Sequence, residues 1–148
     1  MNVLVDTSVW SLALRRKARD LNASEKSTVA ELSELIREGR ARIIGLIRQE
    51  LLSGIKSPSQ YEKLRATLRA FPDLPVTTAD HEAAATTSDS AASRIVRDAC
   101  RAKGVVVSLV DILICAIALA RHCSIFTTDP DFQNYARILP IKLHSPRQ

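Results

Sequence analysis

Four acidic residues stand at corresponding places in this chain, each just beyond an apolar run or near the start of the helix predicted to follow it. They are Asp6, Glu50, Asp111 and Asp129. In a parallel α/β sheet such places share one edge, so we expect the four carboxylates to meet in a single cleft. Carboxylates gathered within about 6 Å would repel one another by roughly 15 kcal/mol at an effective dielectric of about 20, which is comparable with the stability of a small domain. Cations or protons must relieve that repulsion.

The types of these side chains indicate which cation would bind. Carboxylates without histidine or thiolate are hard oxygen ligands, which favour Mg²⁺ or Mn²⁺ over zinc or copper. Hydroxyl side chains accompany the acids and are candidates for orienting carboxylates, water or a phosphate oxygen. These are Thr7, Ser8, Ser108, Thr127 and Thr128. The predicted chemistry is attack on a phosphate ester by water that a divalent metal activates.

Each acid taken alone also has a purely structural interpretation. Asp6 and Asp129 stand where helix caps are expected, and Asp129 precedes a proline. Ser108 and Asp111 have the spacing of a capping box, and Glu50 would suit a solvated helix face. Capping does not require all four acids to fall at one edge of a sheet, so the joint pattern favours a shared site.

Strands and helices alternate along the chain and would position these acids. Short apolar runs predict strands at Asn2–Val5, Arg42–Gly45 and Ser124–Phe126. Apolar residues at helical spacing, with capping residues at the ends, predict helices around them. The predicted helices run from Val9 to about Leu14, from Asn22 to Gly39, from Leu46 to Gly54, from Ser57 to about Ala70, from Thr78 to just before Gly104, and from Leu109 to Arg121. This alternation predicts one three-layer α/β domain over residues 1–148, with a central, mainly parallel sheet flanked by helices.

The remaining segments are shorter. Pro72–Pro75 is predicted to be a loop, Val76 a short strand residue, and Val105–Val107 a brief apolar segment. Asp129 and the proline after it predict a turn into a short helix, and Arg137–Leu143 is predicted as a last strand.

The charge balance favours a polyanionic partner. The net charge is +5 although four carboxylates are expected in one cleft, so the rest of the surface is more basic than the total indicates. Two basic clusters could follow a phosphate backbone or simply be solvated helix faces. They are Arg15, Arg16, Lys17 and Arg19 after the first helix, and Arg94, Arg97 and Arg101 on one face of a later helix. Aromatic residues make up only 4% of the chain, which argues against an extensive base-stacking platform.

The chain is expected to stay in the cytoplasm. Its longest apolar stretch, Val105–Ala120, is interrupted by Ser108 and Asp111, which argues against a membrane span, and the first residues lack the features of a signal peptide. The three cysteines show no zinc-binding or redox spacing and are predicted to be reduced. The neighbours His122 and Cys123 are predicted to be packing and surface residues rather than a ligand pair or a nucleophile.

Several ordered segments resemble one known family. They are residues 5–10 (Val-Asp-Thr-Ser-Val-Trp), residues 50–54 (Glu-Leu-Leu-Ser-Gly), residues 111–118 and residues 126–132. Together they resemble a PIN domain, specifically the VapC toxin of a bacterial VapBC toxin–antitoxin pair. The resemblance runs nearly from end to end, with matching order and spacing.

The resemblance implies a ribonuclease that depends on Mg²⁺ or Mn²⁺, is inhibited by a VapB-like antitoxin and forms a homodimer. Asp6 and Asp111 match the central metal-binding acids of the family, and Glu50 matches the acid of its second motif. Asp129 best matches the fourth acid. Asp131 is the alternative at this corner, and the other of the two aspartates would then cap the next helix.

Other functions remain open at this stage. A phosphoacceptor domain also gathers acids around magnesium, but it would need paired acids after the first strand and a lysine near the last one. Here Asp6 is followed by Thr7, and no lysine accompanies Asp129. A nonenzymatic RNA-binding or protein-binding module, a metal-dependent phosphatase and a DNA nuclease are the further alternatives.

Overall fold

Four parallel strands form the centre of the part of the chain that the structure describes. The computed structural model of this protein describes residues 1–89, 94, 98, 101–102, 104 and 108–148. Its strands are β1 (Val3–Val5), β2 (Ala41–Ile44), β3 (Asp73–Leu74) and β4 (Ser124–Phe126), in the spatial order β3-β2-β1-β4. Each neighbouring pair is parallel, so the carboxyl ends of the strands share one edge. The predicted α/β class with a central parallel sheet is confirmed.

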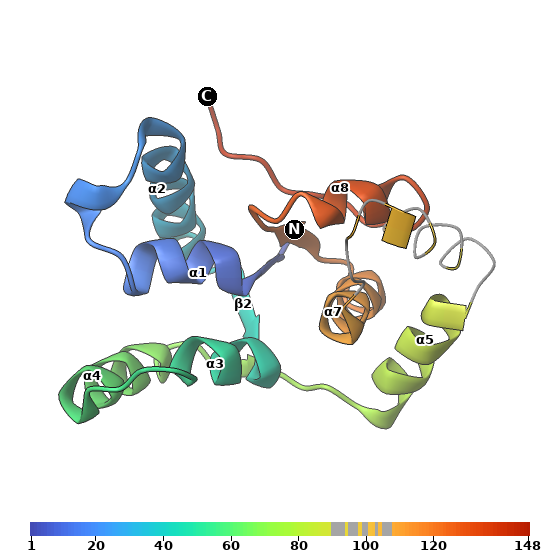
Figure 1. Cartoon of the computed structure of the whole chain (residues 1–148), viewed down its shortest axis with the longest axis horizontal. Helices are drawn as coiled ribbons and strands as arrows, with labels where there is room; N and C mark the ends of the chain where they lie inside the picture. Colours follow the sequence, from blue (N-terminus) through green and yellow to red (C-terminus); the bar gives the residue numbers. More distant parts are fainter. Residues whose placement is uncertain (90–93, 95–97, 99–100, 103, 105–107) are drawn as a thin grey trace.

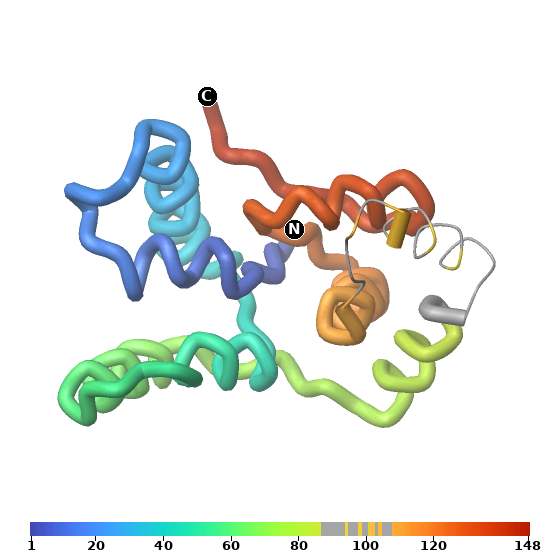
Figure 2. Tube along the Cα trace, in the orientation of Figure 1, coloured from blue at the N-terminus to red at the C-terminus, as the bar shows by residue number. Residues whose placement is uncertain are grey.

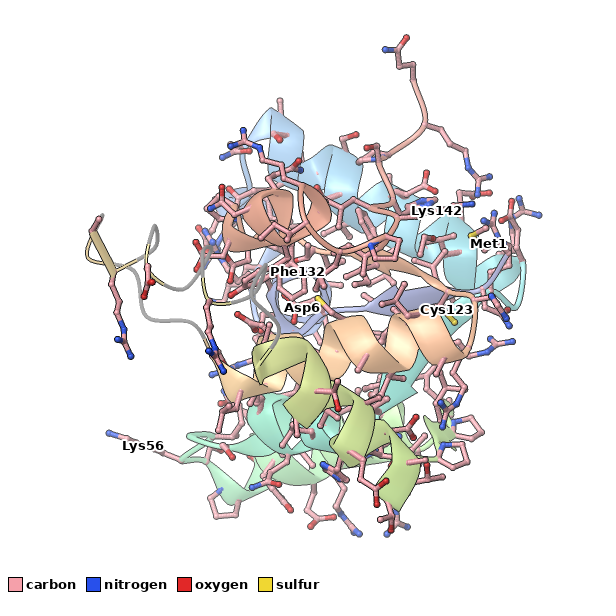
Figure 3. The ribbon with its side chains drawn as sticks, turned by 90° about the vertical axis from the view of Figure 1, so that its right-hand side faces the viewer. Met1, Asp6, Lys56, Cys123, Phe132 and Lys142 are labelled. Carbon is pink, nitrogen blue, oxygen red and sulfur yellow. The ribbon has the colours of Figure 1, made fainter. Side chains whose placement is uncertain are left out.

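Helices flank this sheet. They are α1 (Thr7–Leu14), α2 (Ala23–Arg37), α3 (Gly45–Leu52), α4 (Pro58–Leu68), α5 (Thr78–Asp89), α7 (Leu109–Ala120) and α8 (Asp131–Ala136), with a short 3₁₀ helix at Ala18–Asp20. In Figure 1, α1 to α4 lie on the left and α5, α7 and α8 on the right, with β2 between them. The view in Figure 3 shows the strands between α2 and α8 on one side and α5 and α7 on the other. Among the described residues, no helix is both long and apolar enough to cross a membrane.

The strands and α7 supply the centre of the hydrophobic core. All three residues of β1 are fully buried, as expected for a parallel strand that is covered on both faces. The middle of α7, residues 112–118, is also buried, as expected for a helix that is apolar nearly all round. Trp10 packs into the core, and its indole N–H donates to the carbonyl oxygen of Val5 at 3.1 Å, so burial leaves no donor unpaired there.

The C-terminal tail returns from α8 toward α2 (Figure 2). Its attachment depends on the buried carboxylate of Glu31, which lies 2.7 Å from His144 Nε2 and accepts the backbone N–H of Arg147 at 3.1 Å. The Arg147 guanidinium also donates to both carboxylate oxygens of Glu38, at 2.6 and 2.8 Å. These contacts hold the tail against one face of α2.

Two strand predictions are wrong. Residues 73 and 74 form β3 inside the predicted Pro72–Pro75 loop, while Val76 lies outside any strand. The prolines on either side lack the N–H that a ladder needs, so this edge strand stops after two residues. The predicted strand Arg137–Leu143 is reduced to a single bridge between Ile125 and Leu143. The backbone N–H groups of residues 138 and 139 turn back to the carbonyl of Tyr135 instead, and Pro140 has no N–H to give to a ladder.

The helix boundaries agree closely with the predictions, with small corrections. β2 ends and α3 begins one residue earlier than predicted, at Ile44 and Gly45. Thr77 caps α5 in place of Thr78, because Asp80 Oδ2 accepts the Thr77 N–H at 2.7 Å and Thr77 Oγ1 accepts the Asp80 N–H at 3.4 Å. The rest of the helix predicted to reach Gly104, and the segment at residues 105–107, lie outside the described residues apart from isolated positions.

Candidate active site

The four predicted acids line one open pocket of about 480 Å³ at the carboxyl edge of the sheet. Asp6 follows β1, Glu50 lies in α3 after β2, Asp111 lies in the first turn of α7, and Asp129 follows β4. Each is therefore placed by a different strand or by the helix next to it. The meeting of four acids at one sheet edge, expected from their positions, is what the structure shows.

Asp6 is the most buried of the four, with a relative exposure of 7%. Its carboxylate makes no capping bond to α1. Oδ2 instead accepts the hydroxyls of Ser8 and Thr127, both at 2.8 Å, and the backbone N–H of Asp6 donates to Phe126 O at 2.9 Å. The alternative of a simple helix cap is therefore not what the geometry shows. The bonds from α1 and from the end of β4 fix the orientation of this carboxylate.

Glu50 is exposed at the rim of the pocket. The hydroxyl of Thr7, the first residue of α1, donates to its Oε2. Thr7 and Ser8 are adjacent, so one turn of α1 orients two acids that stand 44 residues apart in the sequence. Glu50 is thus held toward the site rather than left as a freely solvated helix residue.

Among the four acids of the pocket, Asp111 has a pKa that its surroundings raise strongly. Burial is the main cause that raises its pKa to about 7, and the nearby carboxylates of Asp129, Asp6 and Asp131 raise it further. The phenol of Tyr135 opposes them by donating to Asp111 Oδ2 at 3.4 Å. A proton on Asp111 is one way to relieve the repulsion among the acids, and a bound cation is the other.

The fourth corner of the pocket is occupied by Asp129. Its backbone N–H donates to Thr127 Oγ1 at 3.0 Å, and its Oδ1 accepts the backbone N–H of Asp131 at 2.9 Å. Asp131 does not line the pocket, although burial and the neighbouring Asp129 raise its pKa. Of the two candidates, Asp129 is the one that faces the shared space, while one of its oxygens also orders the start of α8.

The hydroxyl side chains divide into two groups. Thr7, Ser8 and Thr127 bond directly to carboxylates of the pocket. Ser108 instead caps α7, accepting the N–H of Val110 at 3.1 Å, and Thr128 contributes only its backbone N–H, which donates to Ser8 Oγ at 3.1 Å. Three of the five predicted supporting hydroxyls therefore contact an acid, and Ser108 has the capping role that was the alternative.

Other residues of the site were missed from the sequence. Tyr135 is buried in α8, and its spacing of four residues from Asp131 is the only sequence signal that it shares a helix face with an acid. Gln49 and Ser53 also line the pocket, on either side of Glu50 along α3 and its end. Nothing in their types distinguishes them from ordinary surface residues.

The donor set fits a hard divalent cation. The ion pairs formed among the described residues all use other acids, so no arginine, lysine or histidine described in the structure neutralises the four in the pocket. Within the same described part of the chain, no three acid, imidazole or thiol side chains already converge on a point as metal ligands do. The acids surround an open space and would have to close around an ion.

Because the carboxyl of Asp111 is buried beside other acids, Asp111→Asn should stabilise the metal-free protein. A carboxyl with a raised pKa binds more protons in the folded than in the unfolded protein between about pH 4 and 7, so the free energy of unfolding falls as pH rises through that window. The variant removes that fall and should gain on the order of 2 kcal/mol at pH 8 and almost nothing at pH 4. Urea unfolding in EDTA measures both values.

A matched control is Glu82→Gln, which neutralises an exposed acid on α5. It should change the free energy of unfolding by less than about 0.5 kcal/mol at either pH. Equal stability of Asp111→Asn and the parent protein at pH 8 would show that the carboxylate of Asp111 is not under electrostatic strain.

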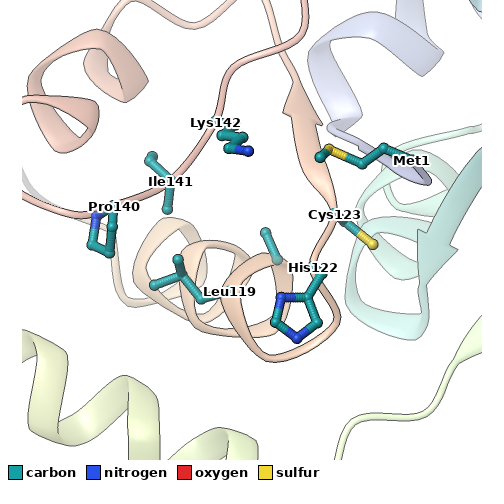
Figure 4. Close-up of a pocket in the computed structure, with 8 residues that line it drawn as sticks. Met1, Leu119, His122, Cys123, Pro140, Ile141 and Lys142 are labelled. Atoms are coloured by element: carbon teal, nitrogen blue, oxygen red, sulfur yellow. The ribbon is translucent and has the colours of Figure 1, made fainter.

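A second pocket, of about 140 Å³, lies at the opposite end of the sheet (Figure 4). Figure 3 shows Asp6 and Cys123 at the two ends of the strands. His122 and Cys123 line this second pocket. The thiol of Cys123 donates to Arg121 O at 3.6 Å, and burial raises its pKa, so it lacks the thiolate character of a nucleophile. Cys115 is likewise buried, and Cys100 lies outside the described residues.

Of the two basic clusters predicted from the sequence, only the one after α1 lies entirely within the described residues. Arg97 lies outside the described residues, so the proposed face of Arg94, Arg97 and Arg101 is not visible as a unit. Arg15, Arg16 and Lys17 are exposed and line a groove next to α4, whereas Arg19 is exposed but does not line it.

Comparisons with known proteins show similarity along nearly the whole chain. The family model described as "PIN domain" matches residues 3–138. A VapC ribonuclease of Mycobacterium bovis and the ribonuclease VapC11 of Mycobacterium tuberculosis are each 32% identical to this chain over 148 residues, covering 98% of it and 99% of the relative.

Solved structures show the same fold at lower identity. VapBC2 of Rickettsia felis, crystallised with a DNA fragment from its promoter, matches with a TM-score of 0.63 and 17% identity, over 97% of this chain and 98% of the other. FitAcB of Neisseria gonorrhoeae matches with a TM-score of 0.62 and 21% identity, over 97% of each chain.

Proposed function

Since this chain belongs to the PIN-domain family, we propose that it is a metal-dependent endoribonuclease and the toxin of a type II toxin–antitoxin pair. The observation that carries the proposal is the single pocket lined by Asp6, Glu50, Asp111 and Asp129. Relatives named as ribonucleases, which match 98% of the chain, support RNA as the substrate. The proposal takes residues 1–148 as one nuclease domain.

The proposed ligands of a Mg²⁺ or Mn²⁺ ion are Asp6, Asp111, Glu50 and Asp129. Such an ion would lower the pKa of a water molecule and offset charge on the scissile phosphate. Ser8 and Thr127 hold the carboxylate of Asp6 in one orientation, and Thr7 does the same for Glu50. Asp111 must lose the proton that its raised pKa favours, which the charge of a bound cation promotes. No side-chain nucleophile is required.

The proposed partners are inferred from the relatives. The fold resembles that of proteins solved as VapBC and FitAcB, which supports a VapB-like antitoxin as the partner of this chain. A homodimer and a cytoplasmic location are further parts of the proposal. The scissile phosphate of the RNA would have to reach the acidic pocket at the carboxyl edge of the sheet.

Metal dependence is the direct test of this function. The purified protein should cleave single-stranded RNA in Mg²⁺ or Mn²⁺, lose the activity in excess EDTA, and regain it when the metal is restored in excess of the chelator. Gel analysis of end-labelled RNA measures each step. Cleavage at the same rate in EDTA would exclude the proposed mechanism, and phosphorylation by acetyl phosphate without RNA cleavage would favour the phosphoacceptor alternative.

A further inference from the structure

A second groove, of about 570 Å³, lies between the end of α1 and α4. Residues 13–17 and Ile55 form part of its wall, and Gln60, Lys63, Leu64 and Thr67 form the rest. The four α4 residues follow the spacing i, i+3, i+4 and i+7, so they present one helix face to the groove. In Figure 1 the left end of α1 lies above the left end of α4.

The groove is lined by basic side chains, and most of them form no ion pair with a described residue. Three of its side chains, Arg15, Lys17 and Lys63, are exposed and take part in none of the ion pairs among the described residues. Arg16 is different, because its guanidinium pairs with Glu25 at 3.0 Å. No acidic residue lines the groove, so the free cations face a space without counter-charge from the described lining.

Two structural elements join this groove to the acidic pocket. Thr7 and Ser8 at the start of α1 line the acidic pocket, and residues 13–17 at its end line the groove. At a rise of about 1.5 Å per residue the two ends of α1 are about 10 Å apart. Ser53 lines the pocket and Ile55 the groove, so the segment after α3 makes the same connection. The same two segments of the chain therefore border both spaces.

We propose that this basic groove, defined by residues 13–17, Ile55 and the Gln60–Thr67 face of α4, holds the backbone of the RNA strand beside the scissile phosphate. The inference rests on the proposed function. An acidic pocket repels a polyanion, so affinity for RNA has to come from cations nearby, and this groove supplies them within the reach of a few nucleotides. Gln60 and Thr67 add hydrogen-bonding groups suited to phosphate and sugar oxygens. Its apolar floor at Leu14, Ile55 and Leu64 can contact sugars without reading sequence.

The test uses binding without turnover. In an Asp6→Asn background, the triple change Arg15→Gln, Lys17→Gln and Lys63→Gln should weaken binding of a fluorescein-labelled single-stranded RNA of mixed sequence, followed by anisotropy. For single strands each phosphate contact contributes about 0.7 to the slope of log affinity against log salt, so three lost contacts should reduce that slope by about 2. In the cleavage-competent protein the same triple change should raise the KM.

The control is Lys142→Gln, which removes one exposed cation outside the groove. Figure 3 places Lys142 at the end of the sheet away from Asp6. This change should alter neither the salt slope nor the KM for RNA. Thermal unfolding of every variant checks that the exposed substitutions leave the fold intact.

The outcomes separate the groove from the nuclease function. Unchanged RNA affinity and salt slope in the triple variant, with RNA still cleaved by the parent protein, would overturn the groove while leaving the function standing. Loss of affinity for an acidic peptide but not for RNA would also overturn it in favour of a protein partner. Absence of metal-dependent cleavage by the parent protein would instead remove the function on which the inference rests.

Discussion

The variant Asp6→Asn should cleave RNA at least about 10³-fold more slowly than the parent protein, because it removes a negatively charged oxygen ligand from the centre of the acidic pocket. The fold should survive. Asp6 is 7% exposed and its Oδ2 accepts the hydroxyls of Ser8 and Thr127. A hydroxyl can either donate or accept, so both can adapt to the oxygen or to the amide nitrogen of an asparagine of the same shape.

The measurement is single-turnover cleavage of labelled RNA in Mn²⁺, with unfolding by urea as the check on stability. The control Glu82→Gln neutralises an exposed acid outside the pocket and should cleave at the parent rate. Cleavage by Asp6→Asn within about tenfold of the parent, a difference of only about 1.4 kcal/mol, would mean that Asp6 does not hold the metal. The same protein should also fail to gain thermal stability from added Mn²⁺, a readout independent of RNA.

The place of the acids could be predicted because it depends on connectivity alone. Parallel strands deliver the residues that follow them to the same edge, so apolar runs ending before Asp6 and Asp129 were sufficient to bring those two together. Asp111 follows from the same connectivity. The helix α7 leads into β4, so its first turn, which carries Asp111, lies at the edge where β4 ends. The resemblance to a known family pointed to the same residues independently.

The sequence indicated hydroxyls as partners of the acids, but which partner bonds to which acid could not be predicted, because that depends on three-dimensional packing. The bond from Tyr135 to Asp111 joins α8 to α7, and the bond from Thr7 to Glu50 joins α1 to α3. A sequence gives each residue its place on an element, but not the rotation of that element against its neighbour. The strand β3 was missed for a different reason. It consists of two residues at the sheet edge, which is too short for a periodic pattern to be recognised.

The second large effect is expected on the free energy of unfolding, from the ion pair between Asp80 and Arg121 that joins α5 to α7. Asp80 at the start of α5 is 4% exposed, and the guanidinium of Arg121 at the end of α7 donates to both of its carboxylate oxygens at 2.7 Å. Thr77 adds a backbone and a hydroxyl donor. The hydrogen bonds from Arg121 are the main cause that holds the pKa of Asp80 well below its usual range. This pair ties α5 to the helix that carries Asp111.

Arg121→Met should therefore cost about 3 to 5 kcal/mol in the free energy of unfolding at neutral pH, because it leaves a buried carboxylate without its charged partner. Since the folded pKa of Asp80 is lowered, the stability from this pair is fully present above the unfolded pKa and is lost as pH falls below about 4 toward the folded pKa, so the cost should shrink in that acid range. Urea unfolding at pH 7 and at about pH 3 measures it. The double variant Asp80→Asn with Arg121→Met removes both charges and should recover most of the loss. A cost below about 1 kcal/mol at pH 7, typical of an exposed ion pair, would mean that water reaches Asp80 and that α5 does not anchor α7 through this contact.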